Sequence, residues 1–135
     1  MKLFLAVPSE GPPPLYAFFD ALEEKQRQKI FTLLALLQRA PGAAMREPYV
    51  KHFSIERYQA LYELRVKSKT LIRIIFTRTD QGDILFLTPF IKRHKRNTMQ
   101  ALDESLGMLA QIHAGTYSVQ EVSIESYIRK GGITQ

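Results

Sequence analysis

Three closely spaced strand-like segments between residues 58 and 91 constrain the fold most strongly. Residues 58–67, 71–78 and 84–91 are rich in aromatic and β-branched side chains. Only short polar turns, residues 68–70 and 80–83, separate them. Turns this short favour strands that pair in sequence order, so the pattern predicts an antiparallel meander.

Helical periodicity flanks this meander on both sides. Apolar residues recur with a spacing of three and four positions over residues 15–22 and again over residues 30–37. The charged stretch 23–29 between them leaves two alternatives open, one long helix or a helical hairpin, and Pro41-Gly42 ends the region. Asn97, with Gln100 three positions later, predicts the cap of a further helix that ends at Gly115.

The remaining segments complete an α+β domain. Residues 2–7 are predicted to form a first strand, and residues 43–57 an irregular connection. The last twenty residues are compatible with an added edge strand or a loose tail. The order strand, two helices, three strands, helix predicts helices packed on an antiparallel sheet, with one sheet face left open to a ligand.

Composition removes several classes of function. The sequence lacks cysteine, which excludes disulfides, thiolate metal sites and a cysteine nucleophile. His52, His94 and His113 do not have the spacing of metal ligands, and no nucleotide-binding loop or catalytic triad motif is present. We therefore expect neither a metal nor another cofactor.

Positive charge is concentrated in the middle of the chain. Residues 48–98 carry eleven basic and four acidic side chains, within a total of 19 against 13. The densest run is Lys92, Arg93, His94, Lys95 and Arg96, directly after the third strand of the meander. A phosphate backbone would relieve the repulsion in such a cluster, although a solvated basic loop is the alternative.

Two arginines inside the predicted strands strengthen the nucleic-acid interpretation. If residues 68–70 form a three-residue loop, Arg65 lies directly opposite Arg73 on one sheet face, whereas a two-residue turn would separate the two arginines across the sheet. Like charges in that position destabilise a sheet unless an anion offsets them. The anion is either a bound ligand or a carboxylate of the protein such as Glu63, and the sequence leaves both open.

No apolar stretch approaches the ~20 residues that cross a bilayer. The opening apolar run, residues 3–7, is too short for an export signal. We therefore expect a cytoplasmic protein without a membrane partner.

An ordered set of short motifs resembles the RelE/HigB-like toxins of bacterial and phage type II toxin–antitoxin systems, a fold also shared by ParE-like proteins. The motifs are Leu61-Tyr62-Glu63-Leu64-Arg65, Arg73-Ile74-Ile75-Phe76 and Ile84-Leu85-Phe86-Leu87-Thr88-Pro89-Phe90-Ile91-Lys92-Arg93. The resemblance covers residues 1–113 as a toxin domain and leaves residues 114–135 as a C-terminal extension.

The resemblance implies a metal-independent endoribonuclease that cuts mRNA on the translating ribosome and is silenced by a cognate antitoxin. The resemblance implies functional roles for Arg65, Arg73, Lys92 and Arg93, with Arg96 at the next basic position. To the catalytic set we add His94, whose imidazole can accept a proton near neutral pH, and we expect Lys67, Lys69, Lys95 and Arg96 to bind the nucleic acid. Cations would stabilise the phosphate as the ribose 2′-hydroxyl attacks it, and His94 or Lys92 would move a proton.

This sequence departs from the family pattern at two places. Thr88-Pro89 stands where family members often have His-Gly, and Arg96-Asn97-Thr98 replaces a Lys-Thr-Pro. Two other functions stay open on the same scaffold: a non-catalytic RNA- or DNA-binding regulatory protein, and a ParE-like gyrase inhibitor.

Overall fold

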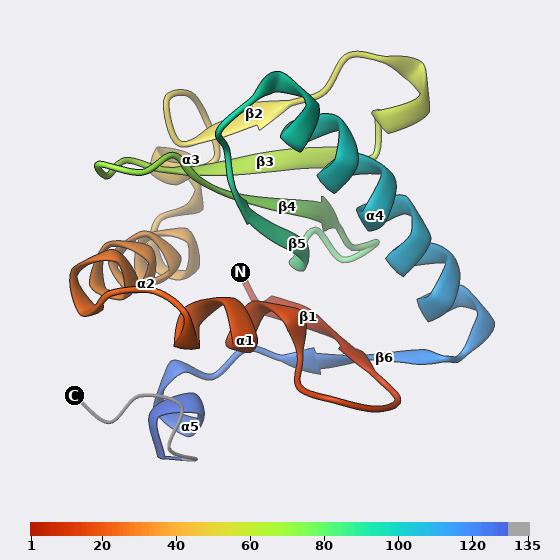
Figure 1. The fold of residues 1–135 in the computed structure, drawn as a ribbon, viewed down its shortest axis with the longest axis horizontal. Coiled ribbons are helices and arrows are strands. Elements are labelled where there is room, and N and C mark those ends of the chain that lie inside the picture. Colours follow the sequence, from red (N-terminus) through yellow and green to blue (C-terminus); the bar gives the residue numbers. More distant parts are fainter. Residues whose placement is uncertain (130–135) are drawn as a thin grey trace.

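The chain folds into one sheet between two helical layers (Figure 1). The computed structural model describes residues 1–129. Its elements in chain order are β1 (Leu3–Pro8), α1 (Pro14–Asp20), α2 (Glu24–Arg39), α3 (Pro41–Ala44), β2 (Val50–His52), a 3-10 turn (Glu56–Tyr58), β3 (Leu61–Val66), β4 (Ile72–Arg78), β5 (Ile84–Ile91), α4 (Lys95–Ala114), β6 (Tyr117–Glu121) and α5 (Ile124–Arg129).

The six strands pair in the order β2-β3-β4-β5-β1-β6. The predicted meander β3-β4-β5 is confirmed, and every neighbouring pair is antiparallel except β1 and β5. Those two strands run parallel, because the elements between them form the long crossover that parallel pairing requires. The α+β prediction is confirmed, with one parallel pair that the sequence pattern did not indicate.

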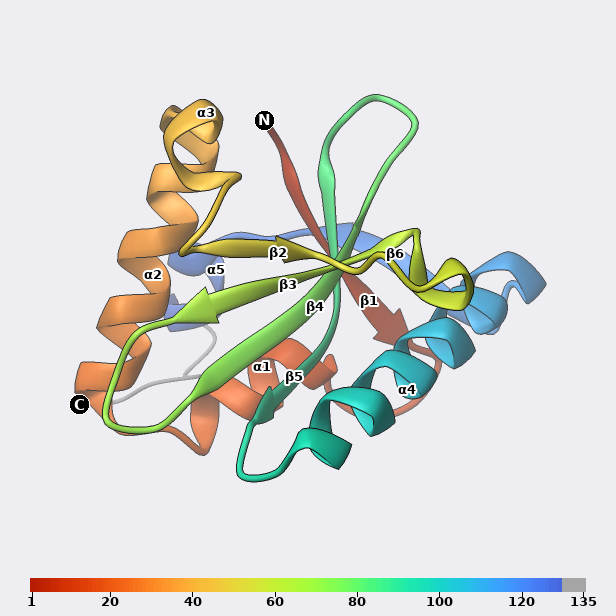
Figure 2. The ribbon, with the colours of Figure 1, turned by 90° about the horizontal axis from the view of Figure 1, so that it is seen from above.

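Helices cover both faces of the sheet, so the expectation of an entirely open face is wrong. Helices α1, α2 and α5 pack on one face, where Phe19, Ile30 and Leu34 are buried against Leu64 and Phe76. Helix α4 packs on the other face. Figure 2 shows that α4 does not extend over the ends of β3 and β4 that meet in their loop. This end of the face is the part left open.

The N-terminal helical region is a hairpin of two helices, α1 and α2. The side chain of Gln26 accepts a hydrogen bond from the Glu23 N–H at 2.9 Å and so caps α2. One guanidinium nitrogen of Arg27 donates to the carbonyls of Phe19 and Leu22 at the end of α1. Because the last carbonyls of a helix have no partner within it, this contact fixes where α1 ends.

Two predicted boundaries are wrong. Residues 43–57 are not simply irregular, since they include the end of α3, all of β2 and part of the 3-10 turn that contains Tyr58. Helix α4 begins at Lys95 with His94 as its N-cap, and not after Asn97. The Asn97 side chain instead accepts hydrogen bonds from the N–H groups of Arg93 and His94, both at 2.8 Å. Lys95 and Arg96 therefore belong to the first turn of the helix.

The C-terminal segment extends the sheet. Strand β6 pairs with β1 as an edge strand, which decides between the two alternatives for residues 117–121. Tyr127 of α5 is buried and donates a hydrogen bond to Asp20 of α1. Residues 130–135, with Gly131-Gly132, lie outside the described residues. Within residues 1–129, no helix combines the length and the apolar character needed to traverse a bilayer.

The packing of α2 on the sheet predicts that two leucine-to-alanine substitutions lower the free energy of unfolding by different amounts. Leu34→Ala removes a side chain that is 1% exposed, and we expect a loss of about 2–5 kcal/mol in the free energy of unfolding. Leu71→Ala truncates a side chain that is 47% exposed, and we expect less than about 1 kcal/mol. Urea denaturation of both variants measures the difference, and equal losses would contradict the described packing.

Candidate nucleic-acid interface

Arg65 and Arg73 lie directly opposite each other on β3 and β4. This register confirms the prediction from a three-residue loop. Two hydrogen bonds fix the loop. The Gln26 side-chain amide of α2 donates to Thr70 Oγ1 at 2.7 Å, and within the loop Ser68 Oγ donates to the Thr70 carbonyl at 2.5 Å. The β3–β4 loop is therefore fastened to α2, beside which it lies in Figure 2.

A single buried carboxylate lies between the two arginines. Glu63 is 1% exposed, and its Oε1 lies 3.0 Å from Arg65 Nε and 3.7 Å from Arg73 Nε. The structure therefore shows that the offsetting anion is a carboxylate of the protein. This one carboxylate lies near both arginines. The three side chains together still carry a formal charge of +1.

Both arginine side chains are partly exposed to solvent. The Arg65 side chain is 28% exposed and the Arg73 side chain 13% exposed. Burial lowers the pKa of Arg73, the attraction of Glu63 opposes that shift, and the repulsion of Arg65 adds to it. An arginine starts from so high a pKa that it stays charged, so Arg73 is a partly desolvated cation. Its attraction for an anion is correspondingly stronger than that of a cation in bulk water.

The end of β5 adds Lys92 to the same face. Phe90 lies opposite Arg73, and the Lys92 N–H donates to the Leu71 carbonyl at 2.8 Å. Because side chains alternate along a strand, Phe90 and Lys92 point to the sheet face that carries Arg73 and Arg65. The structure thus brings Arg65, Arg73 and Lys92 together beside a half-buried aromatic ring.

The rest of the basic run surrounds the start of α4. Arg93, His94, Lys95 and Arg96 are exposed, and within the described residues none of the four has an ion-pair partner. A helix N-terminus carries partial positive charge, so lysine and arginine in the first turn repel it. An anion at this place would relieve that repulsion. These side chains make no hydrogen bond or ion pair with Arg65 or Arg73 among residues 1–129.

Lys67 and Lys69 lie on and beside the β3–β4 loop, and both are exposed. The β3–β4 loop lies at the end of the sheet where β5 leads into α4 (Figure 2). The predicted nucleic-acid-binding residues therefore border the strand arginines on two sides, Lys67 and Lys69 on one and Lys95 and Arg96 on the other.

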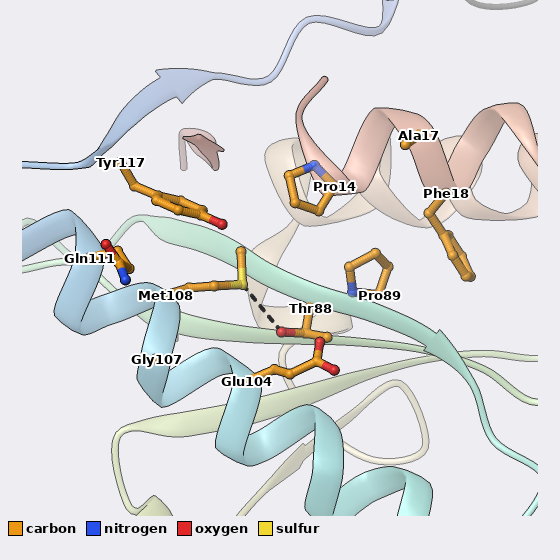
Figure 3. A pocket seen from close by; sticks show the side chains of 10 residues that line it. All are labelled: Pro14, Ala17, Phe18, Thr88, Pro89, Glu104, Gly107, Met108, Gln111 and Tyr117. Atoms are coloured by element: carbon orange, nitrogen blue, oxygen red, sulfur yellow. Dashed lines mark hydrogen bonds between the residues drawn. The ribbon is translucent and has the colours of Figure 1, made fainter. Parts of the chain in front are cut away.

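Thr88 and Pro89 have structural roles away from these cations. Thr88 is 6% exposed, lies 2.8 Å from Ser105 Oγ and donates to the Met108 sulfur at 3.4 Å (Figure 3). Pro89 follows a shift in the β4–β5 register, beyond the last residue that pairs with β1. The sequence predicted an edge or a bulge at this proline, and both features are present.

The cavity beside Thr88 is not suited to a phosphate. It has a volume of about 620 Å³ and lies between α1, β5 and α4. Its charged lining residue is Glu104, and no lysine or arginine of residues 1–129 lines it. The basic residues lie elsewhere on the molecule.

The two remaining histidines, His52 and His113, lie apart from the basic run. His52 stacks on Tyr62 with ring centroids 4.5 Å apart, and a ring nitrogen lies 2.6 Å from the Gln59 carbonyl oxygen. His113 lies in the last turn of α4. In the described part of the chain, no three histidine or carboxylate side chains gather as a metal site would require.

Glu63 is a residue that the sequence analysis named only as one possible partner of the arginines. Its position two residues before Arg65 on the same strand face was the available signal, because alternation places the two side chains together. That it also reaches Arg73 required the register of β4.

A comparison with family models gives one match. The model described as phage-derived protein Gp49-like matches residues 17–106, which include the strand arginines and the whole basic run. No curated protein matches the chain.

We expect the negative charge of Glu63, and not the shape of its side chain, to stabilise this site. Glu63→Gln leaves two cations facing each other, and we expect a loss of about 3 kcal/mol, the low end for a broken buried ion pair because Arg65 still contacts water. Glu47→Gln is the control, since Glu47 also lies near Arg65, at 3.9 Å, but is 75% exposed. Its loss should stay within about 0.5 kcal/mol in the same urea titration. A Glu63→Gln variant as stable as the control would show that the pair needs no internal anion.

Proposed function

The chain belongs to the family of phage-derived Gp49-like proteins, and from this premise we propose that it is the toxin of a toxin–antitoxin module and cleaves mRNA. The family is associated with such toxins. A toxin of this kind requires a cognate antitoxin protein as its partner. The motif resemblance to RelE/HigB-like toxins supports the finer assignment to an endoribonuclease.

One observation carries the proposal: two arginines are fixed side by side through a buried carboxylate, on a face that continues into Lys92 and the basic start of α4. Each guanidinium has five N–H donors in a planar fork, of which Arg65 donates one to Glu63 and Arg73 donates one to the Ile72 carbonyl. The remaining donors suit the two free oxygens of a phosphodiester. Glu63 acts as a positioning residue because it is too buried to meet a substrate.

The reaction this site supports is an internal transesterification. The ribose 2′-oxygen forms a bond to the adjacent phosphorus as the bond from phosphorus to the 5′-oxygen breaks. The 2′-hydroxyl proton passes to a base, and the leaving oxygen takes a proton from an acid. Arg65, Arg73 and Arg93 stabilise the negative charge on the phosphoryl oxygens, while His94 and Lys92 carry the protons. The products are a 2′,3′-cyclic phosphate and a 5′-hydroxyl.

The exposed cations around this centre would hold the substrate. Lys67, Lys69, Lys95 and Arg96 extend positive charge on both sides of the strand arginines. Such a surface attracts a phosphate backbone without reading its sequence. We propose mRNA on the translating ribosome as the substrate, where the backbones of messenger and ribosomal RNA meet this surface together.

A second function is favoured by Thr88. Its hydroxyl is buried against Ser105 and Met108, so it cannot donate or accept a proton at the phosphate. Where family members often have a histidine, this chain thus lacks a titratable group. A protein that binds RNA without cutting it would retain every basic residue described above.

Replacement of one strand arginine should separate these functions. We expect the unmodified protein, incubated with ribosomes translating a defined mRNA, to produce fragments that end in a 2′,3′-cyclic phosphate. Arg73→Ala should lower the cleavage rate by about a hundredfold, as the loss of a single transition-state donor does. Arg78→Ala, at the far end of the same strand, should leave the rate unchanged. Intact mRNA with salt-sensitive binding would support the second function, and absence of binding would exclude both.

The basic first turn of α4 predicts a measurable salt dependence. The affinity for single-stranded RNA should fall linearly on a logarithmic scale as salt rises, because phosphate contacts release counterions. Lys95→Ala and Arg96→Ala should each reduce that slope by roughly 0.7 if each side chain neutralises one phosphate. Fluorescence anisotropy with a labelled oligonucleotide at several salt concentrations gives the slopes. If both variants give the slope of the unmodified protein, the RNA does not contact Lys95 or Arg96.

A further inference from the structure

A groove lies where α2 faces the end of β3. Its volume is about 680 Å³. Lys25 and Lys29 of α2 line one side, and Arg65 and Lys67 line the other. Arg65 therefore lines this groove and also belongs to the interface described above, so the two surfaces are adjacent at this residue.

The groove is lined by four cations, three of which lack an ion-pair partner in the described residues. No aspartate or glutamate lines it. Among residues 1–129, Lys25, Lys29 and Lys67 have no ion-pair partner, and Arg65 is the lining cation that contacts carboxylates. A negatively charged occupant would therefore gain attraction without displacing an existing pair at three of the four cations.

The floor of the groove is apolar. Leu33 and Val66 are buried at its base, Leu36 is half-buried, and the Tyr49 ring is 40% exposed at its edge. Tyrosine is among the residue types that most often dominate binding energy in protein interfaces. The groove thus combines a cationic rim with an aliphatic floor.

The α2 side of the groove has the periodicity of one helix face. Lys25, Lys29, Leu33 and Leu36 succeed each other at intervals of three or four residues, over a length of roughly 16 Å. This matches about three turns of a second helix packed against α2. Such a helix would place apolar side chains on Leu33 and Leu36 and carboxylates near the lysines.

We propose that this groove binds an acidic amphipathic peptide segment, with its apolar side chains on the leucine floor and its carboxylates on the flanking cations. An RNA strand fits less well, because its phosphates would use the lysines while its ribose and bases offer no aliphatic group to Leu33 and Leu36. Charge complementarity and the apolar floor together point to a peptide.

Occupation of the groove would act on the candidate active site through Arg65. A carboxylate of the peptide that bonds Arg65 competes for the donors that would otherwise reach a phosphate. We therefore expect the bound segment to inhibit RNA cleavage. This consequence rests on the proposed function, whereas binding in the groove does not.

A designed peptide tests the binding directly. The probe is a fluorescein-labelled helix of about 16 residues, with leucine at intervals of three and four and glutamate at the polar positions, a length that covers the groove. We expect Lys25→Glu combined with Lys29→Glu to weaken its binding at least about tenfold, as two rim charges reversed against carboxylates should. Arg39→Glu, on the same helix outside the groove, should leave the affinity within about twofold of the unmodified protein.

Two control ligands decide between occupants. A peptide of the same composition in scrambled order should bind more weakly, because it cannot present one apolar face. A labelled oligouridine should bind equally to the unmodified and the doubly substituted protein. If the double substitution leaves peptide affinity unchanged, or removes oligouridine binding as strongly as peptide binding, the proposal is overturned.

Cleavage assays on the same variants separate this proposal from the proposed function. Lys25 and Lys29 lie outside the residues assigned to chemistry, so the doubly substituted protein should cut mRNA at the unmodified rate and resist inhibition by the peptide. Peptide binding by a protein that cuts no RNA would uphold the groove and refute the nuclease. RNA cleavage without peptide binding would uphold the nuclease and refute the groove.

Discussion

The contact of Glu63 with two opposed arginines is the constraint on which the site depends. A carboxylate that is 1% exposed loses most of its hydration, and only close cations can compensate for that loss. Two arginines in direct cross-strand register repel each other, and only a close anion can compensate for that repulsion. Each unfavourable feature is thus tolerable because of the other. The result is a pair of guanidinium groups held in a fixed mutual orientation.

The start of α4 contains a second unfavourable arrangement that has no such internal compensation in the described residues. Lys95 and Arg96 occupy the first turn, where the helix dipole disfavours cations. Acidic residues would stabilise this position, and none is present in the first turn. Local features that lower stability tend to mark functional sites, and here the missing component is an anion. The adjacent Lys92, on the face of the strand arginines, points to the same conclusion.

The sequence predicted the parts of this arrangement that depend on local rules. The length of the 68–70 loop determined the register, and the register placed Arg65 opposite Arg73. Proline at position 89 indicated an edge or bulge from its missing N–H alone. These inferences succeeded because turn length and backbone chemistry act within a few residues.

Other parts depend on packing and could not be predicted in the same way. Strand β2 has three residues, too few to show an alternating pattern. Helix α4 starts earlier than the sequence indicated. The reason is that the Asn97 side chain accepts hydrogen bonds from the N–H groups of Arg93 and His94 and so caps the helix from inside its first turn. The double role of Glu63 needed both the register and the burial of the sheet face, of which the sequence supplies only the first.

Arg65 joins the two surfaces of the molecule because of where β2 begins. Strand β2 starts at Val50, so β3 passes beyond its partner soon after Arg65 donates its N–H to the Tyr49 carbonyl. The Arg65 side chain contacts Glu63, and the residue is also among those that line the groove beside α2. A guanidinium in this position can be shared between a phosphate on one side and a carboxylate on the other, but its five donors are finite. Competition for those donors, and not a change of fold, is the simplest physical route by which one surface could control the other.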